Sequence, residues 1–364
     1  MNNKLAIFIR SYSNPIPRVE RMMRIAETYG YTCEYFGGKR SQNLQYNEKY
    51  NGFDIYRLGF YTPLLNGKNF ILYAWFVFTL NIAILFNLIK KRPKLVHVSD
   101  YELFLSSKIY SIFFRVKLIY NIHDNFAQRY NLPTAVKKGL NILEGINVLL
   151  SNITLVPENF RKKKLPRWCQ HKVFIVRNAP EEPIFSEKKI STKKINIFFG
   201  GWIDEGRGIR KLIDLAKDDK FQIVIAGEGD KQLIDKIKSI NSIRYLGFID
   251  HKTVLKNTMN SDFVWALYNP SREINRYAAS NKIAEALGIG RPVIINKELE
   301  IYKMLKKYNC SIAIDYNDNN INTTLSEITN YAMLSKNSRK AFDENYSWHK
   351  IKKSMTDVYD KLLK

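Results

Sequence analysis

Short apolar runs recur along the chain, and segments of helical length separate most of them. The runs are rich in Val, Ile, Phe and Tyr, which favour β-strands. They occupy residues 4–10, 32–36, 53–58, 94–98, 117–122, 152–156 and 172–176 in the first half, and 195–200, 221–227, 242–247, 262–268, 291–296 and 310–315 in the second. A strand followed by a helix and another strand predicts parallel sheets with right-handed crossovers.

A polar segment divides the two series of strands. Residues 178–194, NAPEEPIFSEKKISTKK, are rich in Pro, Glu, Lys and Ser and have no apolar period, which is typical of an interdomain linker. A chain of 364 residues is long enough for two cores. We therefore predict an α/β protein with two Rossmann-like domains, 1–180 and 181–346, whose parallel sheets face each other across a cleft.

One apolar segment is long for a soluble protein. Residues 70–89, FILYAWFVFTLNIAILFNLI, reach about the length that spans a bilayer, and the basic run 90–92 follows. Periodicity alone does not separate a buried helix from an interfacial one. Because α/β units continue on both sides, our first interpretation is a buried or half-buried helix leading into the strand at 94–98. A membrane-surface helix is the second interpretation and a membrane span the third.

The composition is strongly basic, with 58 Lys and Arg against 34 Asp and Glu and a formal net charge of +24. Such a balance favours a polyanionic partner, an anionic membrane surface or phosphate-bearing substrates. The lysines are spread along the chain and no recognition motif is found, which argues against a nucleic-acid partner. The cysteines, Cys33, Cys169 and Cys310, lie far apart, so a disulfide framework or zinc site is not expected and a reducing cytosol fits.

The stretch 280–295, SNKIAEALGIGRPVII, places a base and an acid on the first turn of an expected helix. Ser280 or Asn281 is a good N-cap residue, and Lys282 and Glu285 share one face. Free N–H groups at a helix N-terminus attract anions, so Lys282 completes a phosphate site. Glu285, an acceptor only, suits ribose hydroxyl groups. The alternative is an ordinary surface pair of a lysine and a glutamate.

A second loop combines glycines with an arginine. Gly200 and Gly201 end an expected strand, and Gly206 and Gly208 flank Arg207. Glycine lets the backbone approach a phosphate closely, and the planar guanidinium binds two oxygens at once. The alternative is a plain turn with surface charges. Either loop lies after a strand, where ligands of parallel sheets bind.

Further candidates lie in the first half of the chain. His123 and Asp124 follow an expected strand, and a histidine there can orient a sugar or shuttle a proton, because its pKa normally lies near neutrality. A loop histidine with satisfied hydrogen bonds is the alternative. His97, inside a strand, and Asp100 are weaker candidates. Arg18 begins a helix and is a candidate for contact with phosphate or acceptor.

Together these segments resemble the GT-B glycosyltransferases, in particular the large retaining GT4-like group (glycosyl transferase group 1) of bacterial surface-polysaccharide biosynthesis. Members of that group often read S-P-N-K-x-x-E-x-x-x-x-G-x-P-V-I at the nucleotide-sugar site. Segments 200–216, GGWIDEGRGIRKLIDLA, 225–230, IAGEGD, and 245–250, YLGFID, are similar to other landmarks of the group. Residues 347–364 resemble its closing helix, which returns to the N-terminal domain.

The resemblance implies a glycosyltransferase, with 181–346 as the donor domain and 1–180 as the acceptor domain. It implies a nucleotide-diphosphate sugar as donor, a UDP-sugar being favoured, and no separate cofactor. Catalytic roles fall to His123, Arg207 and Lys282. Binding of the donor falls to Gly201, Arg207, Ser280, Asn281, Lys282 and Glu285, with Arg207 and Lys282 on phosphate and Glu285 on ribose.

The acceptor implied is a lipid-linked or other saccharide, in the biosynthesis of a polysaccharide such as O-antigen or capsule. The location implied is cytoplasmic, peripheral on the inner face of the membrane. Retention of configuration rests on the resemblance alone. The chain has no Asp-x-Asp, which metal-dependent glycosyltransferases of the other main fold use, so we expect metal-independent transfer. The basic run 161–167, RKKKLPR, is either a solvated loop or a contact with anionic lipid.

Two positions depart from the pattern of the group. Tyr277 stands where the wider family often has a first glutamate, and Trp202 stands where it usually has an arginine. These departures keep two alternatives open on the same fold. One is a nucleotide-sugar 2-epimerase, which needs further acids and no lipid partner. The other is an inactive relative that acts as an assembly partner.

Overall fold

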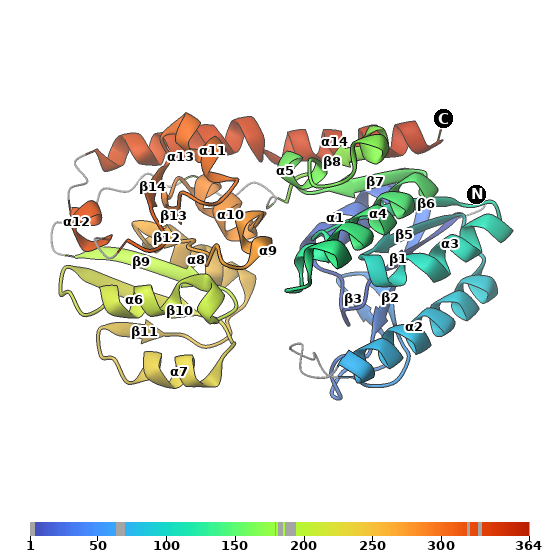
Figure 1. Ribbon diagram of the computed structural model, residues 1–364, viewed down its shortest axis with the longest axis horizontal. Helices are drawn as coiled ribbons and strands as arrows, with labels where there is room; N and C mark the ends of the chain where they lie inside the picture. Colours follow the sequence, from blue (N-terminus) through green and yellow to red (C-terminus); the bar gives the residue numbers. More distant parts are fainter. Residues whose placement is uncertain are drawn as a thin grey trace. The chain divides into compact units, whose positions relative to one another are not determined.

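The computed structural model describes residues 4–62, 70–178, 180, 185, 194–318, 321–326 and 330–363. The chain divides into two compact units (Figure 1). Unit 1 comprises Met1–Arg177 and Lys352–Lys364, and unit 2 comprises Asn178–Ile351. Most of the expected linker 178–194 lies outside the described residues.

Unit 1 is built on an eight-stranded sheet in the order β3-β4-β2-β1-β5-β6-β7-β8. Its strands are β1 (Lys4–Ile9), β2 (Tyr31–Gly38), β3 (Asn47–Tyr50), β4 (Phe53–Leu58), β5 (Leu95–Ser99), β6 (Lys117–Asn121), β7 (Ile153–Val156) and β8 (Val173–Ile175). All pairs are parallel except β3 with β4. The expectation of a purely parallel sheet is therefore wrong at this edge. The β3 sequence NEKY is polar and none of its residues is buried, so no apolar run marks it.

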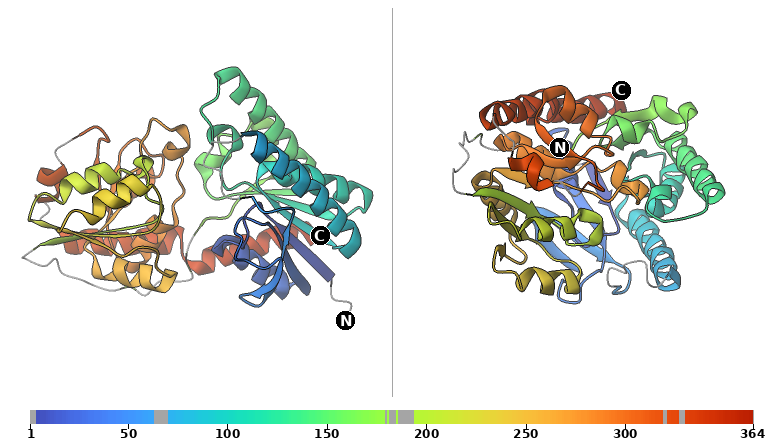
Figure 2. Two further views of the ribbon diagram at one scale, coloured as in Figure 1. Left: turned by 90° about the horizontal axis from the view of Figure 1, so that it is seen from below. Right: turned by 60° about the vertical axis from the view of Figure 1, so that its left-hand side comes forward.

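The helices of unit 1 cover both faces of this sheet. They are α1 (Pro17–Thr28), α2 (Phe70–Lys91), α3 (Phe104–Phe113), α4 (Thr134–Leu150) and α5 (Asn159–Lys162), and α14 (Trp348–Leu363) begins in unit 2 and ends in unit 1. Figure 2 shows α2, α3 and α4 on one face and α1 and α14 on the other. Ile7 and Ile9 of β1 pack in the core cluster with α2, α3 and α4. Phe8, between them, points to the opposite face, where its ring centroid lies 4.8 Å from that of His97.

Helix α2 leads into β5 and packs one stripe of side chains into the core, as expected of a half-buried helix, and the membrane-surface interpretation stays open beside it. Phe76, Leu80, Ile84 and Leu88, spaced four residues apart, form its buried stripe. The segment Ile71–Lys91 is long and apolar enough to cross a membrane, and only 22% of its apolar window is buried. Its outer face is therefore also apolar, unlike that of an ordinary amphipathic helix.

Unit 2 is built on a six-stranded parallel sheet in the order β11-β10-β9-β12-β13-β14. Its strands are β9 (Ile195–Gly200), β10 (Phe221–Ala226), β11 (Ile243–Tyr245), β12 (Phe263–Trp265), β13 (Val293–Asn296) and β14 (Ser311–Ile314). Its helices are α6 (Ile209–Leu215), α7 (Lys231–Lys238), α8 (His251–Asn260), α9 (Glu273–Arg276), α10 (Asn281–Ile289), α11 (Tyr302–Tyr308), α12 (Ile321–Ser326) and α13 (Tyr331–Asn345). Asp230 and Asp250 cap α7 and α8 through their carboxylates.

Each sheet has one point at which the strand order reverses. In unit 1 this point lies between β1 and β5, and in unit 2 it lies between β9 and β12. Loops leave the carboxyl ends of these neighbouring strands in opposite directions, which opens a space for ligands. The two reversal points therefore locate the candidate site residues of each unit.

Candidate functional site

In unit 2 the loops after β9 and β10 pack backbone against backbone. The amide of Gly201 donates to the carbonyl of Ala226 at 3.0 Å, and that of Ile203 donates to Glu228 at 2.7 Å. A Cβ on Gly227 would lie 1.8 Å from the Gly201 oxygen. Only a glycine allows this approach, and it holds the Gly201 loop at the strand ends.

Lys282 and Arg207 lie together at the reversal point of unit 2. The Lys282 ammonium lies 3.9 Å from the ring centroid of Phe199, a β9 residue, and 5.8 Å from that of Tyr268, which follows β12. The Arg207 guanidinium lies 4.8 Å from the same Tyr268 ring. A Cβ on Gly201 would lie 3.5 Å from the ammonium, so the glycine loop borders the same space. The phosphate candidates of two separate motifs therefore lie around one aromatic ring.

Arg207 acts on Lys282 as a like charge, and the carboxylates of Glu285 and Asp204 act on it as opposite charges. Burial and the neighbouring Arg207 guanidinium hold the pKa of Lys282 well below its usual value. None of the ion pairs formed among the described residues involves Lys282. A bound anion would favour the charged form of this lysine, so the site is chemically suited to phosphate.

The first turn of α10 differs from the expected N-cap. Ser280 is the N-cap residue, but its side chain makes no capping hydrogen bond, and the helix begins at the exposed Asn281. The expectation of a side-chain cap is therefore wrong. The first N–H groups of α10 keep their capacity to bind an anion beside Lys282.

Glu285 is buried, and it is paired across space rather than along the helix. Its Oε1 lies 3.0 Å from Nε2 of His251, the first residue of α8. The alternative interpretation, an ordinary surface pair of Lys282 and Glu285, is therefore wrong, because Glu285 is paired with His251, although Glu285 still acts on Lys282 through its charge. Sequence reasoning missed His251, because it lies in another motif.

Trp202 and Tyr277, the two departures from the family pattern, both lie in loops of unit 2. Trp202 is exposed, directly after Gly201. Tyr277 is half-buried and follows α9 as its C-terminal cap residue. Glu273, the first residue of α9, is the acid nearest upstream of Tyr277 in the chain.

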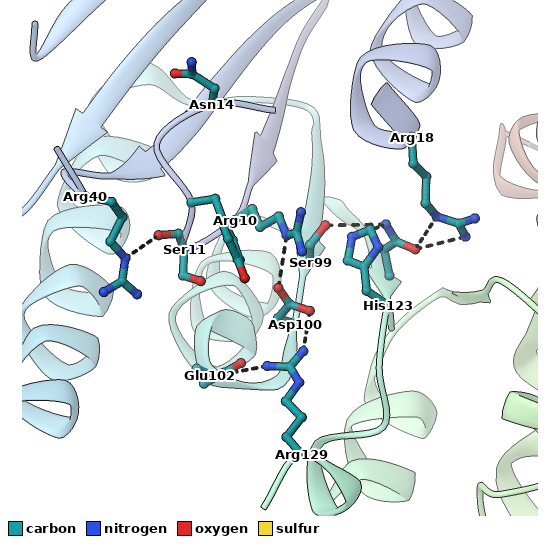
Figure 3. Close-up of polar contacts among 12 residues, drawn as sticks. Arg10, Ser11, Asn14, Arg18, Arg40, Ser99, Asp100, Glu102, His123 and Arg129 are labelled. Atoms are coloured by element: carbon teal, nitrogen blue, oxygen red, sulfur yellow. Dashed lines mark hydrogen bonds and ion pairs between the residues drawn. The ribbon is translucent and has the colours of Figure 1, made fainter. Parts of the chain in front are cut away.

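In unit 1 an ion-pair cluster lies at the reversal point between β1 and β5 (Figure 3). Asp100, directly after β5, accepts from Arg10 Nε at 3.2 Å and from Arg129 at 2.7 Å. Arg129 also donates to Glu102 at 2.9 Å. The two guanidinium groups hold the pKa of Asp100 below its usual value in spite of burial. Asp100 has a positive φ of 72°, an uncommon backbone conformation outside glycine.

Sequence reasoning ranked Asp100 low and missed Arg10 and Arg129. Arg10 directly follows the first strand, and that position was the available signal for it. Arg129 follows the short turn Phe126–Gln128 and carries no motif. Only the fold brings these three residues together.

His123 lies beside this cluster, with its hydrogen bonding set by its neighbours. Arg18 donates to Oδ1 of Asn121 at 3.2 Å and 3.3 Å, so the Asn121 amide nitrogen faces Nε2 of His123 at 3.1 Å. Nε2 therefore accepts, and the ring proton lies on Nδ1. Burial and the Arg10 guanidinium hold the pKa of His123 well below its usual range. The expectation of titration near neutrality is wrong, because this imidazole stays neutral and offers one N–H donor.

Burial decides the roles of three other candidates, namely Arg18, His97 and the basic run 161–167. Arg18 is 2% exposed, and its guanidinium is bonded to Asn121 and to the Val176 carbonyl, so it is a structural residue. His97 lies in the core, as its place inside a strand indicated. Arg161, the first residue of the basic run, is buried and bonded to Asp124 at 2.6 Å, so the run is not a simple solvated loop.

Comparison with protein-family models and with curated protein sequences gives no match. Solved structures match over the whole chain. Sucrose-phosphate synthase from Thermosynechococcus elongatus superposes with a TM-score of 0.80 at 15% identity and covers 99% of each chain. HepE from Anabaena, in complex with UDP-glucose, has a TM-score of 0.69 at 13% identity and covers 98% of this chain and 100% of its own.

A third similar structure is the catalytic domain of starch synthase IV from Arabidopsis thaliana bound to ADP and acarbose. It has a TM-score of 0.66 at 10% identity and covers 100% of this chain and 99% of its own. Likeness at such low identity describes the fold. The chain therefore has the GT-B glycosyltransferase fold, as the sequence predicted.

Proposed function

We propose that this chain is a glycosyltransferase that moves a sugar from a nucleotide-diphosphate sugar to a saccharide or lipid-linked acceptor. The observation that carries the proposal is the meeting of Lys282, Arg207 and Gly201 at the reversal point of the unit 2 sheet. Cations and free backbone N–H groups at the carboxyl ends of parallel strands suit a diphosphate.

In the reaction, the bond between the sugar carbon and the diphosphate oxygen breaks. The acceptor oxygen bonds to that carbon and its hydroxyl proton is released. Negative charge develops on the leaving diphosphate, where Lys282, Arg207 and the N-terminus of α10 stabilise it. Such stabilisation needs no metal ion, so we propose metal-independent transfer. Retention of configuration follows from the family resemblance alone.

The nucleotide would extend from the phosphates toward Glu285, with Ser280 and Asn281 at the start of α10. One carboxylate oxygen of Glu285 is bonded to His251, so the other is available to ribose hydroxyl groups. We favour a UDP-sugar, because HepE, similar in fold, binds UDP-glucose. In unit 1 the neutral His123 would donate from Nδ1 to a substrate hydroxyl, so its role is to orient the substrate.

We also propose that unit 1 docks on the cytoplasmic face of the membrane, where lipid-linked acceptors of polysaccharide biosynthesis lie. The outer sides of α2, α3 and α4 expose an apolar face made of Trp75, Phe78, Ile82, Phe86, Leu105, Ile112, Phe113, Ile142, Leu143, Ile146 and Leu150. Phe113 is 79% exposed and Phe78 is 56% exposed. Exposed basic residues flank this face, namely Lys90, Arg92, Arg115 and Lys138. Apolar surface with a basic rim suits an anionic bilayer.

The experiment that tests the donor site is a binding screen against UDP, GDP, CMP and their sugar conjugates by thermal shift and calorimetry. A ligand that binds only the native state raises the melting temperature by mass action. We expect one diphosphate to bind, and binding to weaken by about tenfold or more in Lys282→Met and to be kept in Lys236→Met, a matched change on the exposed side of α7.

Turnover then distinguishes the proposed enzyme from its alternatives. We expect sugar release from the donor to depend on an added acceptor. Interconversion of UDP-GlcNAc without acceptor would show an epimerase. Failure of every nucleotide to bind would show an inactive relative, and Trp202 and Tyr277 would then mark the lost site.

A further inference from the structure

A cavity of about 460 Å³ opens among α2, α3 and α4 of unit 1. Its walls are mainly apolar and include Val77 of α2, Leu105 of α3 and Leu150 of α4. The volume lies within the range of about 300–1,000 Å³ that is common for small-molecule sites. The same helices carry the exposed apolar face, so the cavity opens within that face.

Tyr73 and Glu102 form one polar part of the cavity lining, which also includes Lys108 of α3 and Asn147 of α4. Tyr73 donates its hydroxyl to Glu102 at 2.8 Å, and Arg129 donates to the same carboxylate oxygen at 2.9 Å. Arg129 continues to Asp100, and Asp100 accepts from Arg10. Glu102 therefore joins the cavity lining to the ion-pair cluster at the reversal point of the unit 1 sheet, and Figure 3 shows that cluster.

Arg40 adds a further cation at this polar end. Its guanidinium lies 5.9 Å from the Tyr73 ring and 3.9 Å from the Phe76 ring, and its Nε donates to the Ser11 carbonyl at 3.0 Å. Among the described residues Arg40 pairs with no carboxylate. One buried nitrogen of its guanidinium, Nη1, lacks a hydrogen-bond partner there.

The cluster as a whole has an excess of positive charge and of donors. Arg10, Arg40 and Arg129 supply three cations, while Asp100 and Glu102 supply two anions. Arg10 is 9% exposed, and its Nη1 also lacks a partner in the part of the chain that the structure describes. Buried polar atoms are normally satisfied, and here two guanidinium nitrogens and Glu102 Oε2 lack partners among the described residues, which suits an anionic ligand that also brings a hydroxyl group.

We propose that this is a binding site for a lipid phosphate, with the hydrocarbon chain in the cavity and the phosphate or diphosphate on Arg40 and Arg10. An apolar cavity next to an anion site suits a ligand that has both a hydrocarbon chain and an anionic group. A neutral saccharide has neither. The role of this site rests on the proposed glycosyltransferase function, because the lipid phosphate would be the part of the acceptor that anchors it.

The test measures binding of alkyl phosphates of increasing chain length, below their critical micelle concentrations, by calorimetry in the absence of nucleotide. Each buried methylene should strengthen binding up to about fourfold, until the cavity is filled and the affinity levels off. An alkyl glucoside of equal length has the chain without the anion. We expect it to bind at least tenfold more weakly than the phosphate.

Two variants separate the chain from the phosphate. Val77→Trp fills the cavity and should shorten the chain length at which affinity levels off, whereas Ile82→Trp, on the exposed side of the same helix, should leave it unchanged. Arg40→Met should weaken the binding of the alkyl phosphate by at least tenfold and leave the binding of the alkyl glucoside unchanged. Arg40 is chosen because its removal leaves no buried carboxylate without its cation.

Three results would overturn the proposal. They are affinity independent of chain length, equal binding of phosphate and glucoside, and binding of glucose 6-phosphate as tight as that of decyl phosphate. The last would show a site for soluble sugar phosphates. Nucleotide binding to unit 2 is measured separately on the same variants. Loss of nucleotide binding in every preparation would refute the glycosyltransferase and leave the lipid-phosphate result standing, whereas unchanged alkyl glucoside binding by Arg40→Met shows that unit 1 of the variant is folded.

Discussion

The ammonium of Lys282 lies 3.9 Å from the ring centroid of Phe199, and its three donors have no carboxylate partner among the described residues. A cation over an aromatic face is stabilised by the ring, but less than by a carboxylate. Burial and Arg207 therefore lower the pKa of this lysine. Several properties of the protein depend on how this cation and its surroundings respond to an anion.

We expect binding of a nucleotide diphosphate to be coupled to uptake of a proton by Lys282. In the free protein the pKa of Lys282 is lowered, and a bound diphosphate raises it, so binding weakens as the pH rises above the pKa of the free protein. Calorimetry over a series of pH values, with two buffers of different ionisation enthalpy at each pH, measures the uptake. Lys282→Met should abolish it and weaken binding by about tenfold or more. Equal proton uptake by wild type and Lys282→Met would refute this role.

Gly227→Ala should destabilise unit 2 and weaken nucleotide binding. The added Cβ would lie 1.8 Å from the Gly201 oxygen, so the loop that carries Gly201 must move. Gly247→Ala is the control for a positive φ with open space around the residue, its φ being 66° against 135° at Gly227. We expect the free energy of unfolding to fall by about 1–2 kcal/mol in the control and by more than about 3 kcal/mol in Gly227→Ala. Denaturant unfolding measures the difference, and equal losses would show that the close approach is not needed.

The apolar face should bind anionic vesicles. Phe78→Glu combined with Phe113→Glu should abolish co-sedimentation with vesicles of phosphatidylglycerol and phosphatidylcholine, because charged side chains oppose burial in lipid. Phe248→Glu, an equally exposed phenylalanine in unit 2, should leave it unchanged. Binding should weaken with salt, since the basic rim contributes. Concentration-dependent dimers that the double variant removes, with no vesicle binding, would assign this face to a second copy instead.

His97 should make the protein lose stability in acid. Burial and Arg18 lower the pKa of His97 to about 3 from its ordinary 6.5, so the unfolded chain binds a proton that the folded one does not. The free energy of unfolding should fall as the pH drops below 6.5, by about 2 kcal/mol at pH 5 relative to pH 8. His97→Leu should remove this part of the slope. Identical slopes of wild type and variant would contradict the assignment.

Glu144 should act in the opposite direction. Burial raises its pKa from 4.5 to about 7, although Tyr120 and the Phe126 amide bond to its carboxylate. The folded chain then holds a proton that the unfolded one releases, so stability falls as the pH rises from 4.5 to 7 and levels above it. The loss should total about 3 kcal/mol. The free energy of unfolding of Glu144→Gln, measured from pH 4.5 to pH 7, tests this. If the variant loses as much stability with pH as the wild type does, Glu144 is not the cause of the loss.

The sequence by itself determined the features that depend on neighbours in the chain. Among the described residues, runs of β-branched and aromatic residues predicted every strand except the polar edge strand β3. The motif at 280–295 and the glycine loop around Arg207 located the candidate phosphate site of unit 2, because each is a local signal of a strand end followed by a helix.

Only the tertiary structure decided which side chains meet and how they titrate. Arg10 and Asp100 are 90 residues apart in the chain and form an ion pair. His251 forms a hydrogen bond with Glu285, which lies 34 residues further along the chain in another motif. His123 looked like a titrating loop residue, and burial beside Arg10 keeps it neutral. Ion pairs between distant residues and the desolvation of charged groups depend on packing in three dimensions. The residues next to each group in the sequence therefore do not predict them.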